Sequence, residues 1–205
     1  MPRYLTEPEF SQLMRAISER DTLNRARDRA IFLVLGRTGL RAGELVTLTL
    51  EDVKLDASPP HLWVSTLKRR RRQRDTVLLE RAVCAELKKW IYTGLPAFLR
   101  AYGDHLGRGV NPILFPSSDP TFWRGPMTTR NLSHLFRFYA ERARLPREIT
   151  LHGLRHFRAM TLYSKTGDLE FTRREPRHRS ISSTGVYLHT RADQARAYLE
   201  KLERK

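Results

Sequence analysis

The spacing of apolar residues predicts three helices at the start of the chain. On the first helix, apolar residues recur at helical intervals along one face: Phe10, Leu13, Met14 and Ile17. Thr6 precedes this face as a favourable N-cap, and Glu9 follows at the spacing of a capping box. A second, strongly apolar helix is predicted for residues 24–38, where Gly39 ends it, and a short helix for residues 41–48.

After residue 52 the apolar residues alternate with polar ones, which is the spacing of β-strands. Three short strands are predicted, and their alternating positions are Val53 and Leu55, then Leu62, Val64 and Thr66, then Val77 and Leu79. The last two strands flank a predicted turn at residues 68–74, whose sequence KRRRRQR is highly basic.

Helical spacing returns in the rest of the chain, with helices predicted over residues 83–91, from about Thr128 and from about Leu151. Residues 93–126 are rich in Gly and Pro and are expected to form a loop with one short helix around Phe98. A weakly amphipathic tail follows at residues 192–202. Because no repeat or low-complexity linker interrupts the chain, residues 1–205 are expected to form one domain without a separate N-terminal domain.

The charge balance points to a polyanionic partner. The chain has 38 Lys and Arg against 22 Asp and Glu, which gives a formal net charge of +16. Such an excess repels itself in a compact fold and is typical of proteins that bind nucleic acid. An anionic membrane surface is the alternative. Hydrophobic residues make up 40% of the chain, which is enough for a core and excludes wholesale disorder.

The composition excludes other classes as well. No apolar run reaches the ~20 residues that cross a bilayer, and the N-terminal segment lacks the apolar stretch of a signal peptide. We therefore expect a soluble, cytoplasmic protein. Cys84 is the only cysteine, so neither an intrachain disulfide nor a cysteine-cluster zinc site can form.

Candidate chemistry concentrates between Thr150 and Tyr187. The sequence TLHGLRH spaces His152 and Arg155 so that on a helix both can reach one ligand, while His156 joins that side or turns inward. Arginine binds phosphate with a planar fork of donors, and histidine transfers protons near neutral pH. A solvated helix face or satisfied polar groups of the core would explain the same residues.

Two earlier segments add candidates. Arg41 stands in GRTGLRAGEL at a helix entrance, where Glu44 could hold its guanidinium in one orientation; an ordinary surface ion pair is the alternative. A turn between two strands can push one lysine into a DNA groove, so Lys68 could protonate a leaving oxygen. The arginines that follow it are expected to contact backbone phosphates: Arg69, Arg70, Arg71, Arg72 and Arg74.

A tyrosine could supply a covalent nucleophile. Tyr187 stands near the C-terminus, shortly after His178, and SISST between them suggests the start of a helix. On chemistry alone the other tyrosines remain open: Tyr4, Tyr92, Tyr102, Tyr139, Tyr163 and Tyr198.

GRTGLRAGELVTL, a lysine between two strands, HGLRH, His178 and Tyr187 follow one another in the order of a known catalytic signature. Over nearly its whole length the chain resembles the tyrosine recombinases, also called the phage integrase family. The resemblance implies a mainly α-helical α+β fold with a small antiparallel three-stranded β-sheet on one edge. It also implies a site-specific recombinase that cleaves and rejoins double-stranded DNA through a 3′-phosphotyrosyl intermediate, with no metal ion or other cofactor.

The resemblance also assigns roles to individual residues. Arg41 and Arg155 would clamp the scissile phosphate, with Glu44 and His156 beside them. His152 would assist proton transfer, Lys68 would be the general acid for the 5′-hydroxyl, His178 would support the phosphate and Tyr187 would be the nucleophile. In the family, four protomers assemble on two duplexes, which implies a homotetramer on DNA.

Pro176 and Arg177 depart from the family pattern, which usually has an apolar residue followed by glycine before the histidine. Proline inside a helix costs about 3 kcal/mol, and arginine suits a left-handed turn poorly. A catalytically weakened or silent DNA-binding relative is therefore one alternative. A type IB topoisomerase-like nicking and closing enzyme is another, because it shares the phosphotyrosine chemistry.

Overall fold

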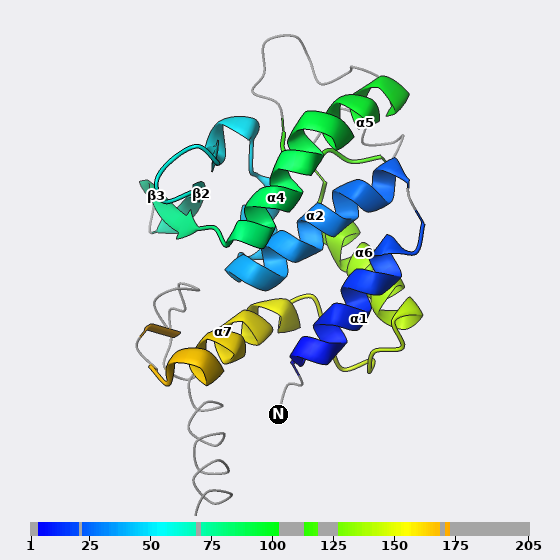
Figure 1. Cartoon of the computed structure of the whole chain (residues 1–205), viewed down its shortest axis with the longest axis vertical. Helices are drawn as coiled ribbons and strands as arrows, with labels where there is room; N and C mark the ends of the chain where they lie inside the picture. The colour runs from blue at the N-terminus through cyan, green and yellow to red at the C-terminus, as the bar shows by residue number, and fades with distance from the viewer. Residues whose placement is uncertain are drawn as a thin grey trace, which may run out of the picture.

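The computed structural model of the chain describes residues 4–20, 22–68, 71–102, 113–118, 127–168 and 171–172, with the backbone alone at 66–68 and 71–73. Helices dominate this part of the chain, and a small sheet lies at one edge (Figure 1). The longer helices are α1 (Glu7–Ser18), α2 (Leu23–Thr38), α4 (Arg81–Lys89), α5 (Leu95–Tyr102), α6 (Thr129–Arg142) and α7 (Gly153–Thr166). Shorter turns are α3 (Ala42–Val46), the 3₁₀ segment η1 (Leu50–Asp52) and the π-helical segment η2 (Trp90–Gly94).

The predicted start of α1 and the predicted end of α2 are confirmed. Thr6 N donates to Glu9 Oε2 at 2.8 Å and Glu9 N donates to Thr6 Oγ1 at 3.4 Å, which completes the capping box. Gly39 ends α2 with a φ of 66°, a left-handed conformation that glycine adopts without strain. The first two helices therefore begin and end where local chemistry places them.

Helix α2 is the centre of the core and packs against α1, α4, α5 and α7 (Figure 1). The ring of Phe10 on α1 stacks on the ring of Phe157 on α7, with centroids 4.7 Å apart. Gly36 on α2 makes room for this pair, because a Cβ at that position would lie 2.3 Å from Phe10 Cε2. The aromatic pair thus ties α7 to the first two helices.

The three predicted strands are present and form one antiparallel sheet in the order β1 (Val53–Lys54), β2 (His61–Lys68) and β3 (Arg71–Leu78). The predicted extent of the basic turn is wrong. Strand β2 continues to Lys68 and β3 already begins at Arg71, its partner, so most of residues 68–74 is strand. Strand pairing uses the backbone, so it continues through polar residues where an antiparallel sheet faces water.

The predicted short helix around Phe98 is confirmed as α5, but residues 93–94, which were expected to be loop, are helical as well. Helix α4 passes through η2 into α5, and Leu95 N donates to Trp90 O, five residues back. Gly94 and Pro96 resemble helix breakers in the sequence. The buried Trp90 and Phe98 form a T-shaped pair with centroids 5.9 Å apart, and this packing outweighs local propensity.

None of the helices in the described part of the chain combines the length and apolar character that a membrane crossing requires.

Candidate active site

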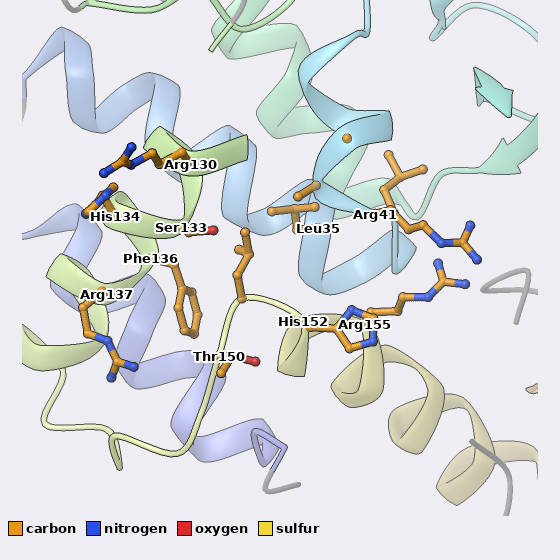
Figure 2. Close-up of a pocket in the computed structure, with 14 residues that line it drawn as sticks. Leu35, Arg41, Arg130, Ser133, His134, Phe136, Arg137, Thr150, His152 and Arg155 are labelled. Atoms are coloured by element: carbon orange, nitrogen blue, oxygen red, sulfur yellow. The ribbon is translucent and has the colours of Figure 1, made fainter. Parts of the chain in front are cut away.

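A cleft of about 840 Å³ opens where α2, α3, α6 and α7 meet (Figure 2). Four arginines and two histidines line it: Arg41, Arg130, Arg137, Arg155, His134 and His152. None of the described residues that line the cleft is acidic. Such a cleft attracts an anion, because charge of one sign in a concave site focuses the electrostatic field.

Arg41 is the N-cap residue of α3, and the local helix geometry pairs it with Glu44. Arg41 N donates to Glu44 Oε2 at 2.8 Å, and Arg41 Nη1 donates to Glu44 Oε1 at 3.0 Å. The side chain of Glu44 is 9% exposed and that of Arg41 is 43% exposed. A buried carboxylate therefore holds the guanidinium on one side, while the same guanidinium remains open to the cleft.

Arg155 reaches the same end of the cleft from α7, and Figure 2 shows the Arg41 and Arg155 guanidinium groups pointing to the same side. Arg155 is 3% exposed, and its Nη1 donates to Gly39 O at 2.6 Å. Gly39 lies just before Arg41 in the chain. This hydrogen bond therefore fixes α7 to the segment that enters α3, and it brings together two arginines that are far apart in the sequence.

His152 lies at the start of α7 as its N-cap residue, one residue before the helix begins at Gly153, so the helix predicted from about Leu151 starts two residues later than expected. Its ring meets that of His156 edge to face, with centroids 4.9 Å apart. Partial burial lowers the pKa of His152, and the positive charges of Arg155 and Arg41 lower it further. Burial, His152 and Arg155 lower the pKa of His156. Both imidazoles are therefore neutral near pH 7 and able to accept a proton.

The other predicted site residues lie on the β2–β3 hairpin or outside the described residues. Lys68 is the last residue of β2, and Arg71 and Arg72 belong to β3. The Arg74 guanidinium lies 5.3 Å from the centroid of the Trp63 ring, and Arg74 does not line the cleft. Outside the described residues are Arg69, Arg70, His178 and Tyr187.

Sequence reasoning missed a basic face on α6. That helix was predicted from its apolar face, which is indeed buried at Leu132, Phe136 and Tyr139. Its opposite face supplies Arg130, Ser133, His134 and Arg137 to the cleft. In Figure 2, Arg130, His134 and Arg137 lie at one end, and Arg41, His152 and Arg155 at the other. The helical spacing of these basic residues was a signal that could have identified them.

The described tyrosines are poor candidates for a nucleophile in this cleft, because none of them lines it. Tyr139 donates its hydroxyl hydrogen to Asp28 Oδ2 at 2.8 Å inside the core. Burial and the negative charge of Asp28 raise the pKa of Tyr139 well above its ordinary value. Within the described ranges, no three His, Cys, Asp or Glu side chains converge closely enough to hold a metal ion.

The fold and the cleft together define a class of protein: a mainly helical α+β domain that presents a pair of arginines to an anionic ligand. The chain belongs to the phage integrase family, whose family model matches residues 3–194. The family and the fold class predicted from the sequence are confirmed.

Two curated relatives are tyrosine recombinases. The chain is 33% identical to XerD of Pseudomonas aeruginosa over 98% of this chain and 61% of the relative. It is 30% identical to XerC of Pelotomaculum thermopropionicum over 100% of this chain and 61% of the relative. The chain thus spans about three fifths of the length of these relatives.

Solved structures of recombinases share the fold. The XerA recombinase is 26% identical with a TM-score of 0.72, over 92% of this chain and 61% of XerA. The XerH site-specific recombinase bound to a palindromic difH substrate is 22% identical with a TM-score of 0.75, over 97% of this chain and 54% of XerH.

Proposed function

We propose that this chain is the catalytic domain of a site-specific tyrosine recombinase, which cleaves and rejoins double-stranded DNA through a 3′-phosphotyrosyl intermediate. Residues 1–205 act as one such domain. The observation that carries the proposal is the meeting of Arg41 and Arg155, from separate elements, at one end of a basic cleft. Membership of the phage integrase family supports the same chemistry.

The arginine pair suits the transition state of phosphoryl transfer. Negative charge then spreads over the non-bridging oxygens of the phosphate, and preorganised cationic donors stabilise it most where the site excludes water. Glu44 fixes the guanidinium of Arg41, and Gly39 O fixes that of Arg155. Because both donors are held before DNA binds, little reorganisation is required when the phosphate arrives.

Cleavage then proceeds as a single displacement at phosphorus. The Tyr187 hydroxyl attacks the phosphorus, its proton passes to His152, and the bond from phosphorus to the 5′-oxygen breaks. Lys68 donates a proton to that oxygen, which leaves as a 5′-hydroxyl, and His178 supports the phosphate. Because its pKa is lowered, the imidazole of His152 is neutral near pH 7 and has a ring nitrogen that can accept this proton. Rejoining reverses these steps with a second 5′-hydroxyl.

Double-stranded DNA is the proposed partner. The formal net charge of +16 and the basic face of α6 supply contacts to the phosphate backbone. The related XerH recombinase and lambda integrase have been solved bound to their DNA sites. In this proposal a homotetramer assembles on two duplexes. Arg69, Arg70, Arg71, Arg72 and Arg74 add backbone contacts along the hairpin.

The test is covalent capture of DNA. The protein is incubated with a pool of nicked duplexes of random sequence, and complexes that survive SDS are isolated and sequenced. We expect a covalent complex that the Tyr187→Phe variant abolishes and the matched Tyr198→Phe variant retains. Loss with Tyr198→Phe instead would show that the nucleophile is misassigned.

The same assay separates the alternatives. Tight DNA binding without any covalent complex would establish a silent DNA-binding relative, which is the outcome that Pro176 and Arg177 favour. A covalent complex together with relaxation of a plasmid, but without recombinant products, would establish a nicking and closing enzyme.

A further inference from the structure

Two arginines on α7 tie this helix to different parts of the molecule. Arg155 Nη1 donates to Gly39 O at 2.6 Å, next to Arg41. One turn further along, Arg158 Nη1 donates to Glu80 Oε1, and the two side chains form an ion pair. Helix α7 therefore links the phosphate-binding end of the cleft to the start of α4, where the β2–β3 hairpin ends.

Glu80 occupies a position whose side chain usually caps a helix. It is the N-cap residue of α4, where Ser, Thr, Asp and Asn are preferred because their short side chains accept from the helix backbone. The Glu80 side chain makes no such capping hydrogen bond. Its carboxylate instead reaches Arg158, whose side chain is 8% exposed. A buried guanidinium needs charged partners, so this ion pair is part of how Arg158 is accommodated inside the fold.

Glu80 lies at the base of the hairpin and Lys68 lies at its tip. The last strand pair is His61 with Leu78, and Leu79 N then donates to Pro60 O at 3.0 Å, directly before Glu80. Strand β3 has 8 residues, which at ~3.3 Å each span roughly 26 Å. A pivot of about 5° at the base would therefore move the tip by roughly 2 Å.

Apolar packing alone does not fix the angle at which the hairpin leaves its base. Leu62, Val64 and Val77 bury one face of the hairpin in the core, but hydrophobic contacts are not directional. A charge-assisted hydrogen bond is directional as well as strong. The Glu80–Arg158 pair therefore adds the orientation that the apolar contacts lack.

We propose that Glu80 and Arg158 are positioning residues whose ion pair sets the angle of the β2–β3 hairpin relative to α7. The pair thereby positions the end of β2, which carries Lys68, relative to the phosphate that Arg155 binds. This inference rests on the proposed function, and neither residue of the pair touches the DNA. A displacement of about 1 Å in a reacting group lowers a rate by about 100-fold, so loss of the pair weakens proton donation to the 5′-oxygen.

The test uses a chemically altered leaving group. The duplex recovered by covalent capture is prepared in two forms, one ordinary and one with sulfur in place of the bridging 5′-oxygen at the cleaved phosphate. A thiolate leaves without a proton donor, because a thiol has a pKa of about 8.5 and an alcohol ionises only far above neutral pH. Sulfur therefore rescues variants that lack the general acid alone.

We expect the Glu80→Ala variant to cleave the ordinary duplex about 10- to 100-fold more slowly than the wild-type protein. On the sulfur duplex it should regain the wild-type rate to within about threefold, and Lys68→Ala should show the same pattern. Glu80→Gln keeps the side-chain shape and should fall between Glu80→Ala and the wild type. DNA affinity should stay constant in the two Glu80 variants.

A matched control comes from the same helix. Glu86 of α4 pairs with Arg29 of α2 at 2.9 Å, so Glu86→Gln removes a comparable ion pair that does not join the hairpin to α7. This variant should cleave both duplexes at the wild-type rate.

The outcomes separate the two proposals. Suppose that the wild-type protein and Lys68→Ala behave as expected. If Glu80→Ala then loses the same activity on both duplexes, or loses no activity on either, the positioning role is refuted and the proposed function stands. If Lys68→Ala is not rescued by sulfur, the assignment of Lys68 fails and the positioning role falls with it. If the wild-type protein forms no covalent complex with either duplex, both proposals are wrong.

Discussion

Replacing Gly36 with alanine tests how closely the core is packed behind the cleft. Gly36 lies inside α2, where an added Cβ would stand 2.3 Å from Phe10 Cε2 and 2.5 Å from Phe10 Cζ. Carbon atoms in contact prefer about 3.5–4.0 Å, so the ring must retreat by more than about 1 Å. It cannot do so freely, because it is buried and stacked on Phe157 at 4.7 Å.

Two opposing effects determine whether Gly36→Ala stabilises or destabilises the protein. Alanine stabilises a helix interior by about 1 kcal/mol relative to glycine, whereas overpacking of a well-filled core costs about 1–3 kcal/mol. The ring is confined on a second side as well, since the guanidinium of Arg37 lies 5.1 Å from its centroid. We therefore expect the cost to fall at the upper end of its range, so that Gly36→Ala lowers the free energy of unfolding by about 1–2 kcal/mol.

Urea denaturation followed by far-UV circular dichroism measures this change, with the slope of the transition unchanged. Gly43→Ala is the matched control, because Gly43 lies inside α3 and no atom beyond its chain neighbours and its own helix backbone would come within 4 Å of the new Cβ. The control should be as stable as the wild type or more stable, by up to about 1 kcal/mol. If Gly36→Ala matches the control, the packing argument around Phe10 is wrong.

Three further predictions follow from the contacts of the site and the core. Glu44→Gln should lower DNA cleavage about 10-fold in the covalent-capture assay, because Arg41 loses one charged partner; unchanged cleavage would contradict the orienting role. His152 and His156 have folded-state pKa values below the ordinary 6.5, so their contribution to stability is full above pH 6.5 and is lost as the pH falls. Between about pH 7 and 5, the urea midpoint of the double variant His152→Gln/His156→Gln should fall less steeply with falling pH than the midpoint of the wild-type protein. Equal dependence on pH in the two proteins would exclude a contribution of these histidines to stability. Tyr139→Phe removes a 2.8 Å hydrogen bond to a buried carboxylate and should cost about 1–3 kcal/mol of unfolding free energy in urea, where no loss would argue against that bond.

Much of the fold follows from contacts between residues that are close in the sequence, and these could be predicted from the sequence. Thr6 and Glu9 cap α1, and Gly39 ends α2, because these contacts lie within one helical turn of the residues that make them. Thr128 caps α6 in the same way, accepting from Asn131 N at 3.1 Å. Periodicity likewise predicted the apolar faces of the helices and the presence of three strands, since both follow from backbone geometry alone.

The same kind of local evidence predicted the contact between Arg41 and Glu44, which stand one turn apart. It could not predict that α4 continues into α5 or how far the strands extend. Trp90 Nε1 donates to Leu114 O at 2.8 Å, a partner that is distant in the sequence. The antiparallel pairing that starts at His61 and Leu78 continues along the backbone to Lys68 and Arg71. Propensity is a weak prior wherever such contacts compete with it.

The family resemblance paired Arg41 with Arg155, but only the tertiary structure showed that the basic face of α6 shares their cleft. The sequence contains Arg41, Arg155 and the basic face of α6 as separate features, and nothing in their spacing joins them. Arg41 and Arg155 meet because the packing of Phe10 on Phe157 fixes α7 against α1, and the hydrogen bond from Arg155 to Gly39 O fixes α7 against the end of α2. The ion pair of Arg158 with Glu80 arises in the same way, between residues that are far apart in the chain. Contacts of this kind depend on how whole helices pack, which no local pattern encodes.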